Sequence, residues 1–255
     1  MSRRLVIKFG GTSLATPKRL KRAARRVAAH RAAGTEVVVV VSARGRTTDR
    51  LLRSVARVGG GGIERAGPSR EADRLLSTGE ERSAALLAVA LWSRGVQARS
   101  LRGGEAGVRS HGGFGRGRIV EVDPAPLRCW LERGTVPVVA GFQGERADGE
   151  TVTLGRGGSD TTAVTIAAAL GADCHIVTDV EAVFDRDPAL DPLARPLRDL
   201  DHDALVSLAE GGAQVVHVEA ARRARHDRVP LWIYHHTAAD ERGGTRVGEA
   251  ACARC

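Results

Sequence analysis

Apolar and polar positions along this 255-residue chain predict strands and helices in regular succession. Five consecutive valines at 37–41 are typical of a strand that is buried on both faces of a parallel sheet. Residues 17–33 have a helical period, with Pro17 at the start and Gly34 just after the end. The same reasoning predicts strands at 5–9, 96–101, 136–140, 174–178 and 230–234, and helices at 47–58, 71–93, 124–133, 159–170, 203–210 and 219–225.

This alternation predicts an α/β fold: an open, mainly parallel β-sheet sandwiched between helices. No linker or repeat is visible, so we expect one domain over residues 1–247 and a short tail over 248–255. Gly79 could break the helix that contains it, and the glycine-rich stretch 103–117 is expected to be an excursion over the active face. Ligands bind at the carboxyl ends of the strands in such sheets, so the glycine-rich segments that follow strands should meet at one edge.

Composition and charge argue against a nucleic-acid-binding protein and against a membrane protein. The net charge is +9, but the arginines are spread along the chain and aromatic residues make up 3%, so we predict no nucleic-acid partner. No apolar run reaches membrane-spanning length and no signal-type segment opens the chain, so we expect a cytoplasmic protein without a membrane partner. Cys252 and Cys255 have C-x-x-C spacing without a second pair, and a frayed tail is the favoured interpretation.

Lys8 is one of three lysines, with Lys18 and Lys21, among 39 basic residues. It begins the segment 8–13, which reads Lys-Phe-Gly-Gly-Thr-Ser and whose two glycines follow the strand predicted at 5–9. A compact ammonium group beside two glycines suits a phosphate, because glycines let backbone amides approach the ligand closely. A tight turn between strand and helix explains the glycines about as well.

Three further segments carry chemistry. Residues 153–163 place a Gly-Arg-Gly-Gly run before Ser159 and Asp160 at the start of a helix, where the dipole favours anions. Helix capping is the simpler explanation for these two side chains, but capping does not require the glycines. Residues 75–81 present acidic side chains that the helix dipole alone could account for, and residues 177–188 form an acidic loop of a kind that is usually solvated.

Together these segments supply a lysine and amides for phosphate oxygens, carboxylates for an amine or a metal, and an arginine for a carboxylate. They contain no Ser-His-Asp arrangement, no metal-ligating histidine cluster and no dinucleotide-binding G-x-G-x-x-G, and we assign no residue as a metal ligand. Phosphoryl transfer depends mainly on positioning and positive charge, and this inventory provides both.

In these segments the sequence resembles the catalytic domain of aspartate kinases, within the amino acid kinase family. The matching stretches are residues 8–13, 41–43, 47–49, 76–80, 141–144, 154–162 and 178–180. They follow the family's order across nearly the whole chain, and together they are far more specific than any one glycine loop.

The resemblance implies the sandwiched sheet of the amino acid kinase fold, and transfer of the ATP γ-phosphoryl group to the side-chain carboxylate of L-aspartate with Mg²⁺. It implies that Lys8 and Asp160 are catalytic, with Arg156 on the substrate α-carboxylate and Glu80 on its ammonium group. The other implied substrate-binding residues are Ser42, Thr48, Gly158 and Ser159. The implied nucleotide-binding residues are Lys8, Gly10, Gly11, Ser13, Thr178, Asp179 and Phe184.

The chain also departs from the family pattern. Ala189 and Gln214 replace an Arg and a Lys, and we hypothesise that Arg44 or Arg46 restores the lost charge at the phosphates. No regulatory ACT-type domain, and hence no feedback control within the chain, is expected after residue 247, and a homodimer is plausible. Two alternatives stay open: a kinase for a related amino acid carboxylate, and a degenerate, non-catalytic subunit that binds an amino acid or a nucleotide.

Overall fold

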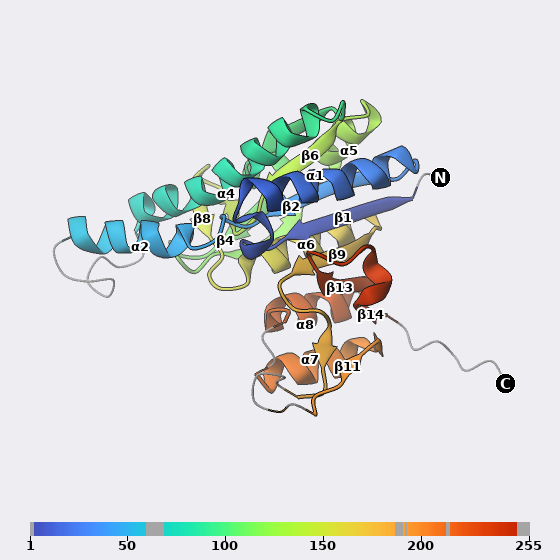
Figure 1. Ribbon diagram of the computed structural model, residues 1–255. Helices are drawn as coiled ribbons and strands as arrows, with labels where there is room; N and C mark the ends of the chain where they lie inside the picture. Colours follow the sequence, from blue (N-terminus) through green and yellow to red (C-terminus); the bar gives the residue numbers. More distant parts are fainter. Residues whose placement is uncertain (1–2, 60–68, 187–190, 192, 213–214, 249–255) are drawn as a thin grey trace.

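The computed structural model describes residues 3–59, 69–186, 191, 193–212 and 215–248. An eight-stranded sheet runs through it in the order β12-β14-β13-β9-β1-β2-β6-β3 (Figure 1). The strands are β1 (Arg4–Phe9), β2 (Glu36–Val41), β3 (Ala98–Leu101), β6 (Val136–Ala140), β9 (Asp173–Thr178), β12 (Asp199–Leu200), β13 (Leu231–His235) and β14 (Thr245–Val247). All neighbours pair in parallel except β13 and β14. The prediction of an open, mainly parallel sheet is confirmed.

Helices cover both faces of this sheet. Helices α1 (Pro17–Ala32) and α4 (Arg70–Trp92) pack on one face, and α5 (Ala125–Glu132), α6 (Gly158–Leu170) and α8 (Val218–Asp227) pack on the other. Helix α7 (His202–Glu210) packs against α8, and α2 (Thr47–Val58) lies beside α4 (Figure 1). The chain alternates between two hydrophobic layers: Val37, Val39 and Val41 face α1 and α4, whereas Val38 and Val40 face α5 and α6. Every valine of the predicted strand is therefore buried, as a strand covered on both sides requires.

A second, four-stranded sheet, in the order β5-β4-β7-β8, was not predicted. Its strands are β4 (Val108–His111), β5 (Arg118–Val122), β7 (Gln143–Glu145) and β8 (Thr151–Thr153). Residues 103–117, expected to be an excursion over the active face, contain β4 and the 3-10 turn η2 (Gly104–Ala106), which were not predicted. Two-stranded pairing of β10 (Val183–Phe184) with β11 (Pro196–Leu197) was also missed.

The break considered at Gly79 does not occur, and α4 runs through that position. A Cβ there would lie 3.0 Å from the Cβ of Ala43, which is closer than nearly all real contacts. Glycine therefore lets α4 approach the loop after β2 closely. Within the described part of the chain, no helix has the length and apolar character needed to cross a bilayer. The extent of the catalytic domain stays a prediction, and most of the predicted tail, residues 249–255, lies outside the described residues.

Candidate active site

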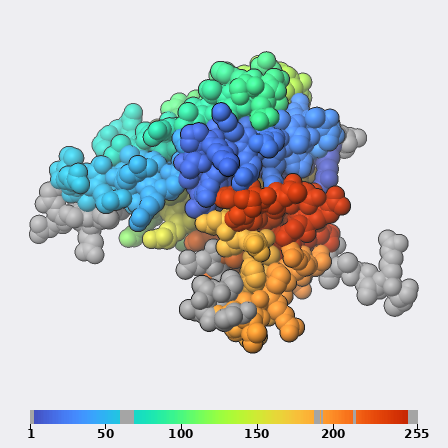
Figure 2. Space-filling model, in the orientation of Figure 1, coloured from blue at the N-terminus to red at the C-terminus, as the bar shows by residue number. Residues whose placement is uncertain are grey.

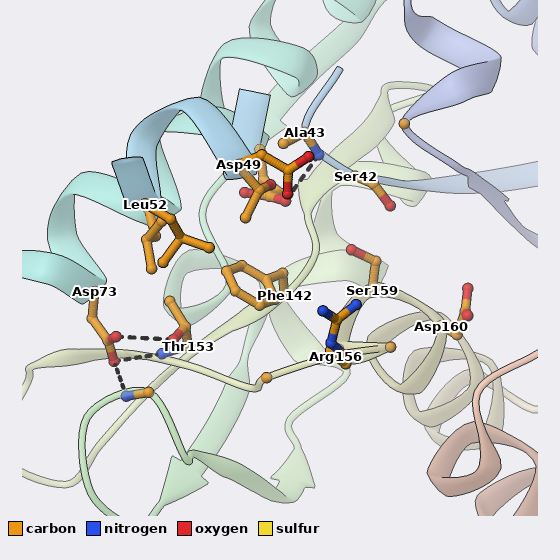
Figure 3. A pocket seen from close by; sticks show the side chains of 18 of the residues that line it. Ser42, Ala43, Asp49, Leu52, Asp73, Phe142, Thr153, Arg156, Ser159 and Asp160 are labelled. Atoms are coloured by element: carbon orange, nitrogen blue, oxygen red, sulfur yellow. Dashed lines mark hydrogen bonds between the residues drawn. The ribbon is translucent and has the colours of Figure 1, made fainter. Parts of the chain in front are cut away.

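A cleft of about 770 Å³ opens where the carboxyl ends of β1 and β2 meet α2, α4 and the start of α6 (Figure 3). It brings together nine of the side chains and glycines that the sequence singled out. These are Lys8, Gly11, Ser42, Thr48, Glu80, Arg156, Gly158, Ser159 and Asp160. The expectation that separate glycine-rich segments meet at one edge is met for these residues.

Lys8 and Asp160 form the central charged pair of the cleft. Lys8 Nζ lies 2.6 Å from Asp160 Oδ1, and the two side chains are 11% and 13% exposed. Lys8 comes from the second-last position of β1, and Asp160 from the first turn of α6. The ion pair is thus shielded from bulk water and tied to two rigid elements, so the ammonium group is held at a fixed position.

The loop after β1 is packed tightly against its neighbours. The Gly10 amide donates to the Val177 carbonyl at 3.0 Å, and the Gly45 amide donates to the Gly11 carbonyl at 2.8 Å. A Cβ on Gly11 would lie 2.4 Å from the Ala43 carbonyl oxygen, so no larger residue fits there. The glycines therefore let the loop after β1 pack closely against the loop after β2. Because they have no side chains of their own, they also leave their backbone atoms next to Lys8.

The second glycine loop brings backbone and an arginine to the same place. Gly157 has a φ of +71° and is the N-cap of α6, and a Cβ there would lie 2.0 Å from the His217 ring. Arg156 is exposed and lines the cleft, and among the described residues its guanidinium group has no hydrogen-bond or ion-pair partner. Figure 3 shows Arg156 beside Ser159 and Phe142, at the mouth of the α6 N-terminus. A guanidinium group without a protein partner can pair with a carboxylate of a ligand.

Glu80, which comes from α4, is a buried carboxylic acid that lines the cleft. Its side chain is 3% exposed, and Oε1 accepts a hydrogen bond from the Ala43 amide at 2.9 Å. Oε2 is buried and has no partner in the described structure. Burial raises the pKa of Glu80 to about 7, and the Ala43 amide offsets only part of this effect. An oxygen of this kind is suited to a cationic donor that arrives with a ligand.

Ser42 and Thr48 lie on either side of the loop that leads into α2. The Ser42 amide donates to the Phe9 carbonyl at 3.1 Å, and the Ser42 side chain lines the cleft. Helix α2 has no buried residue, but Leu52 and Val55 line the cleft with it, so the helix forms one wall over the polar floor.

Of the seven predicted nucleotide-binding positions, two, Lys8 and Gly11, line the cleft. Ser13 is 2% exposed and its hydroxyl donates to the Val177 carbonyl at 3.2 Å. Thr178 is the last residue of β9 and Asp179 follows it, and the Thr178 hydroxyl donates to Asp179 Oδ1 at 3.2 Å. Phe184 lies in β10, and the structure does not place it, Gly10, Ser13, Thr178 or Asp179 in the lining of the cleft.

Sequence patterns gave no site role to Asp73 and Phe142, two further residues that line the cleft. Asp73 is 1% exposed, and its Oδ2 accepts from the amides of Gly115 and Thr153, both at 2.8 Å, while Oδ1 accepts from the Thr153 hydroxyl at 2.9 Å (Figure 3). It joins α4 to β8 and to the loop after β4. Phe142 has a φ of 67°, a strained conformation for an aromatic residue, and its ring lines the cleft. An acidic residue in a first helical turn gives no sequence signal for such a role.

The hypothesis on replacement charges receives no geometric support. Arg44 Nε donates to the Leu14 carbonyl at 2.7 Å and Arg44 Nη2 to the Ala15 carbonyl at 3.2 Å, so this side chain holds the η1 turn (Thr12–Leu14). Arg46 is 85% exposed and lies 3.7 Å from Asp49. Ala189 and Gln214, whose substitution motivated the hypothesis, lie outside the described residues.

The chain is similar to proteins of known family. The model of the amino acid kinase family matches residues 3–235. An aspartokinase from Thermus thermophilus is 44% identical over 248 residues, which are 97% of this chain and 60% of that protein. An aspartokinase from Mycolicibacterium smegmatis is 46% identical over 231 residues, 90% of this chain and 54% of that protein. The chain thus spans a little over half the length of these relatives.

A solved structure gives the same result for the fold. The chain superposes on E. coli aspartokinase III, crystallised with aspartate and ADP, with a TM-score of 0.82 and 27% identity. The match covers 96% of this chain and 64% of that one.

Proposed function

Because this chain belongs to the amino acid kinase family, we propose that its cleft transfers the γ-phosphoryl group of ATP to the side-chain carboxylate of L-aspartate. The proposal rests on one observation above all: the buried Lys8–Asp160 ion pair lies in the same cleft as Arg156 and Glu80, two groups of opposite charge that lack a complete set of partners. An α-amino acid carries the two complementary groups. The aspartokinases that resemble the chain support the choice of aspartate.

Substrate recognition follows from the unpartnered groups. The Arg156 guanidinium group would pair with the α-carboxylate, because its planar fork matches two carboxylate oxygens. The Glu80 carboxylate would accept the α-ammonium group at Oε2, the buried oxygen that has no partner. With both ends of the amino acid fixed, the side-chain carboxylate would extend toward Lys8, and Ser42, Thr48, Gly158 and Ser159 would line its path.

The transfer itself needs no base. An oxygen of the aspartate side chain, ionised at neutral pH, forms a bond to the γ-phosphorus while the bond from that phosphorus to the β,γ-bridging oxygen breaks, and ADP leaves with that electron pair. Negative charge is spread over the transferring group throughout. Lys8 would stabilise this charge, and Asp160 would keep the ammonium group in place. The nucleotide would bind next to the residues predicted to contact it, which are Gly10, Gly11, Ser13, Thr178, Asp179 and Phe184.

The residues present fit Mg²⁺ in the form in which it accompanies ATP. Magnesium keeps most of its waters and takes one or two carboxylates besides the phosphates. Asp160 is the candidate ligand, because its contact with Lys8 lacks the alignment of a hydrogen bond and Oδ1 has no other partner among the described residues. Bound there, the ion would neutralise phosphate charge.

A hydroxamate assay tests the proposal directly. The protein is incubated with ATP, Mg²⁺, hydroxylamine and one amino acid from a panel, and the acyl phosphate is trapped as the hydroxamate. We expect product with L-aspartate, and a loss of about 10²–10³-fold or more in turnover for Lys8→Ala. Lys18→Ala, which removes an exposed lysine of α1, is the matched control and should keep full activity.

The panel also distinguishes the alternatives. Turnover with glutamate or another amino acid in place of aspartate would keep the kinase reaction and change its substrate. Absence of product with every acceptor, while aspartate or ATP still binds in calorimetry, would favour the non-catalytic alternative and contradict the proposal.

A further inference from the structure

A second polar cluster lies under helix α1, on the sheet face opposite α5 and α6. Three side chains each contribute one ligand atom to this cluster. They are His30 in the last turn of α1, His175 in the middle of β9 and Glu241 in the 3-10 turn η3 (Glu241–Gly243). These three atoms all lie within 4.8 Å of one another. The C-terminal end of α1 is at the amino edge of the sheet, so the cluster is separate from the cleft at the carboxyl edge.

His175 is the deepest member of the cluster. It is completely buried, and its Nε2 has no hydrogen-bond partner in the described structure. Its Nδ1 lies 3.0 Å from the hydroxyl of Tyr234, which is also completely buried. A buried imidazole with one nitrogen fixed and the other left without a partner has the arrangement that metal-ligating histidines share.

We propose that His30, His175 and Glu241 bind a divalent transition-metal ion, for which zinc is the best fit. Two imidazoles and one carboxylate are a known zinc ligand set, and a water completes the tetrahedron. The proposal is independent of the kinase reaction. It gives the protein a structural site that joins the N-terminal helix, a central strand and the segment after β13.

The geometry is close to what zinc requires. Ligand atoms about 2.1 Å from a tetrahedral ion lie about 3.4 Å apart, so donors within 4.8 Å need to contract slightly. His30 and Glu241 are only partly buried, so side-chain rotation can provide that movement around the fixed His175. The rings of His30 and His175 already lie edge to face, with centroids 5.8 Å apart.

Two arginines and one carboxylate are the charged groups near the two histidines. Arg3 and Arg26 are the nearby cations. Arg3 is paired with Asp173 at 2.9 Å, and Arg26 donates to the Ala238 carbonyl and lies 4.7 Å over the Tyr234 ring. Glu241 is the anion that offsets them.

Such a link would join two parts of the chain that lie against each other in Figure 2. The C-terminal part of the chain, in red, lies flat against the blue N-terminal part. An ion held by α1, β9 and η3 would tie these two distant parts of the sequence together. It would stabilise the folded state only, because the three ligands are far apart in the unfolded chain.

The test uses the full chain carrying Cys252→Ser and Cys255→Ser, so that the C-x-x-C thiols cannot bind zinc. The protein is stripped with a chelator, dialysed and titrated with Zn²⁺, and with Co²⁺ as a spectroscopic probe. We expect one zinc per chain by elemental analysis, a visible Co²⁺ spectrum of a tetrahedral site, and a rise of several degrees in Tm on zinc addition. His30→Gln and Glu241→Gln should weaken zinc binding by at least about tenfold, and Tyr234→Phe by about 10–100-fold.

His111→Gln, at an exposed histidine outside the cluster, is the matched control and should bind zinc as the parent does. Because His30 and Glu241 are only partly buried, their variants are expected to fold even where a change at His175 would not. The proposal is overturned if the stripped parent takes up no zinc, which would mean that the cluster holds water alone. It is also overturned if His30→Gln and Glu241→Gln bind zinc as tightly as the parent.

Discussion

The ammonium group of Lys8 lies 2.6 Å from the carboxylate of Asp160, although the two residues come from the first strand and from the start of α6. Neither side chain is more than 13% exposed. A contact of this kind is strong only while both partners are present, because removal of one leaves the other as an uncompensated buried charge. The pair therefore acts as one unit.

Non-additivity of the two positions is the first prediction. We expect Asp160→Asn to lower kcat by about 10²–10³-fold, since the amide cannot hold Lys8 electrostatically. The double variant Lys8→Ala/Asp160→Asn should be little worse than the poorer single variant, as found for residues that act together. Hydroxamate kinetics on the three variants measure this. Losses in kcat that multiply would show that Lys8 and Asp160 work independently.

The raised pKa of Glu80 predicts a pH-dependent stability. The carboxyl group titrates at about 7 in the folded protein and near 4.5 when unfolded, so between these values the folded state binds more protons. The free energy of unfolding should therefore fall as pH rises from about 4.5 to about 7, by about 3 kcal/mol at most from this group, and then level off. Glu80→Gln should remove this contribution.

The measurement is urea unfolding of wild type and Glu80→Gln at pH values from 5 to 8. The variant should gain stability relative to wild type as pH rises, and the difference should stop growing above about pH 7.5. A pH-independent difference between the two proteins would mean that Glu80 is ionised in the folded state throughout.

Asp73 gives a prediction about stability alone. Three hydrogen bonds from Thr153 and Gly115 end on its buried carboxylate, so Asp73→Ala leaves their donors without a partner. We expect a loss of about 3 kcal/mol in the free energy of unfolding. Asp203→Ala is the control, because the Asp203–Arg225 pair at 3.1 Å is exposed and should be worth less than about 1 kcal/mol. Equal losses would assign no anchoring role to Asp73.

The main sheet was predictable because its strands are apolar and its helices periodic. The valines at 37–41 can only be a buried strand, and Pro17 marks the start of α1 at the residue where the structure has it. The second sheet was not predictable from periodicity, because β7 and β8 have three residues each and β4 lies within a glycine-rich stretch. Strands this short are defined by their partners across the sheet, and pairing between distant segments leaves no local pattern.

The cleft likewise has residues that the sequence predicts and residues that it does not. Its glycine loops could be found in the sequence, because Gly11 and Gly157 occupy positions where a Cβ would collide with backbone or with a ring. The roles of Asp73 and Phe142 depend on contacts across the fold. The cluster of His30, His175 and Glu241 was not predicted, and no residue was assigned as a metal ligand, because no short spacing joins these three residues.

A comparison of alanine substitutions at Gly157 and Gly149 separates the cost of backbone strain from the cost of a steric collision. Alanine at this position would adopt an unfavourable φ of +71° and would also place its Cβ 2.0 Å from the His217 ring. Gly149 has a similar φ of +81°, but a Cβ there meets nothing within 4 Å. We expect Gly149→Ala to lower the free energy of unfolding by about 1–2 kcal/mol from strain alone, and Gly157→Ala by at least about 2 kcal/mol more. Urea unfolding measures both values.

Because the collision would move Arg156 with its loop, Gly157→Ala should also raise the KM for aspartate, whereas Gly149→Ala should leave it unchanged. Equal losses of stability in the two variants would show that α8 moves aside freely, and that the close packing of His217 does not fix the position of the arginine loop.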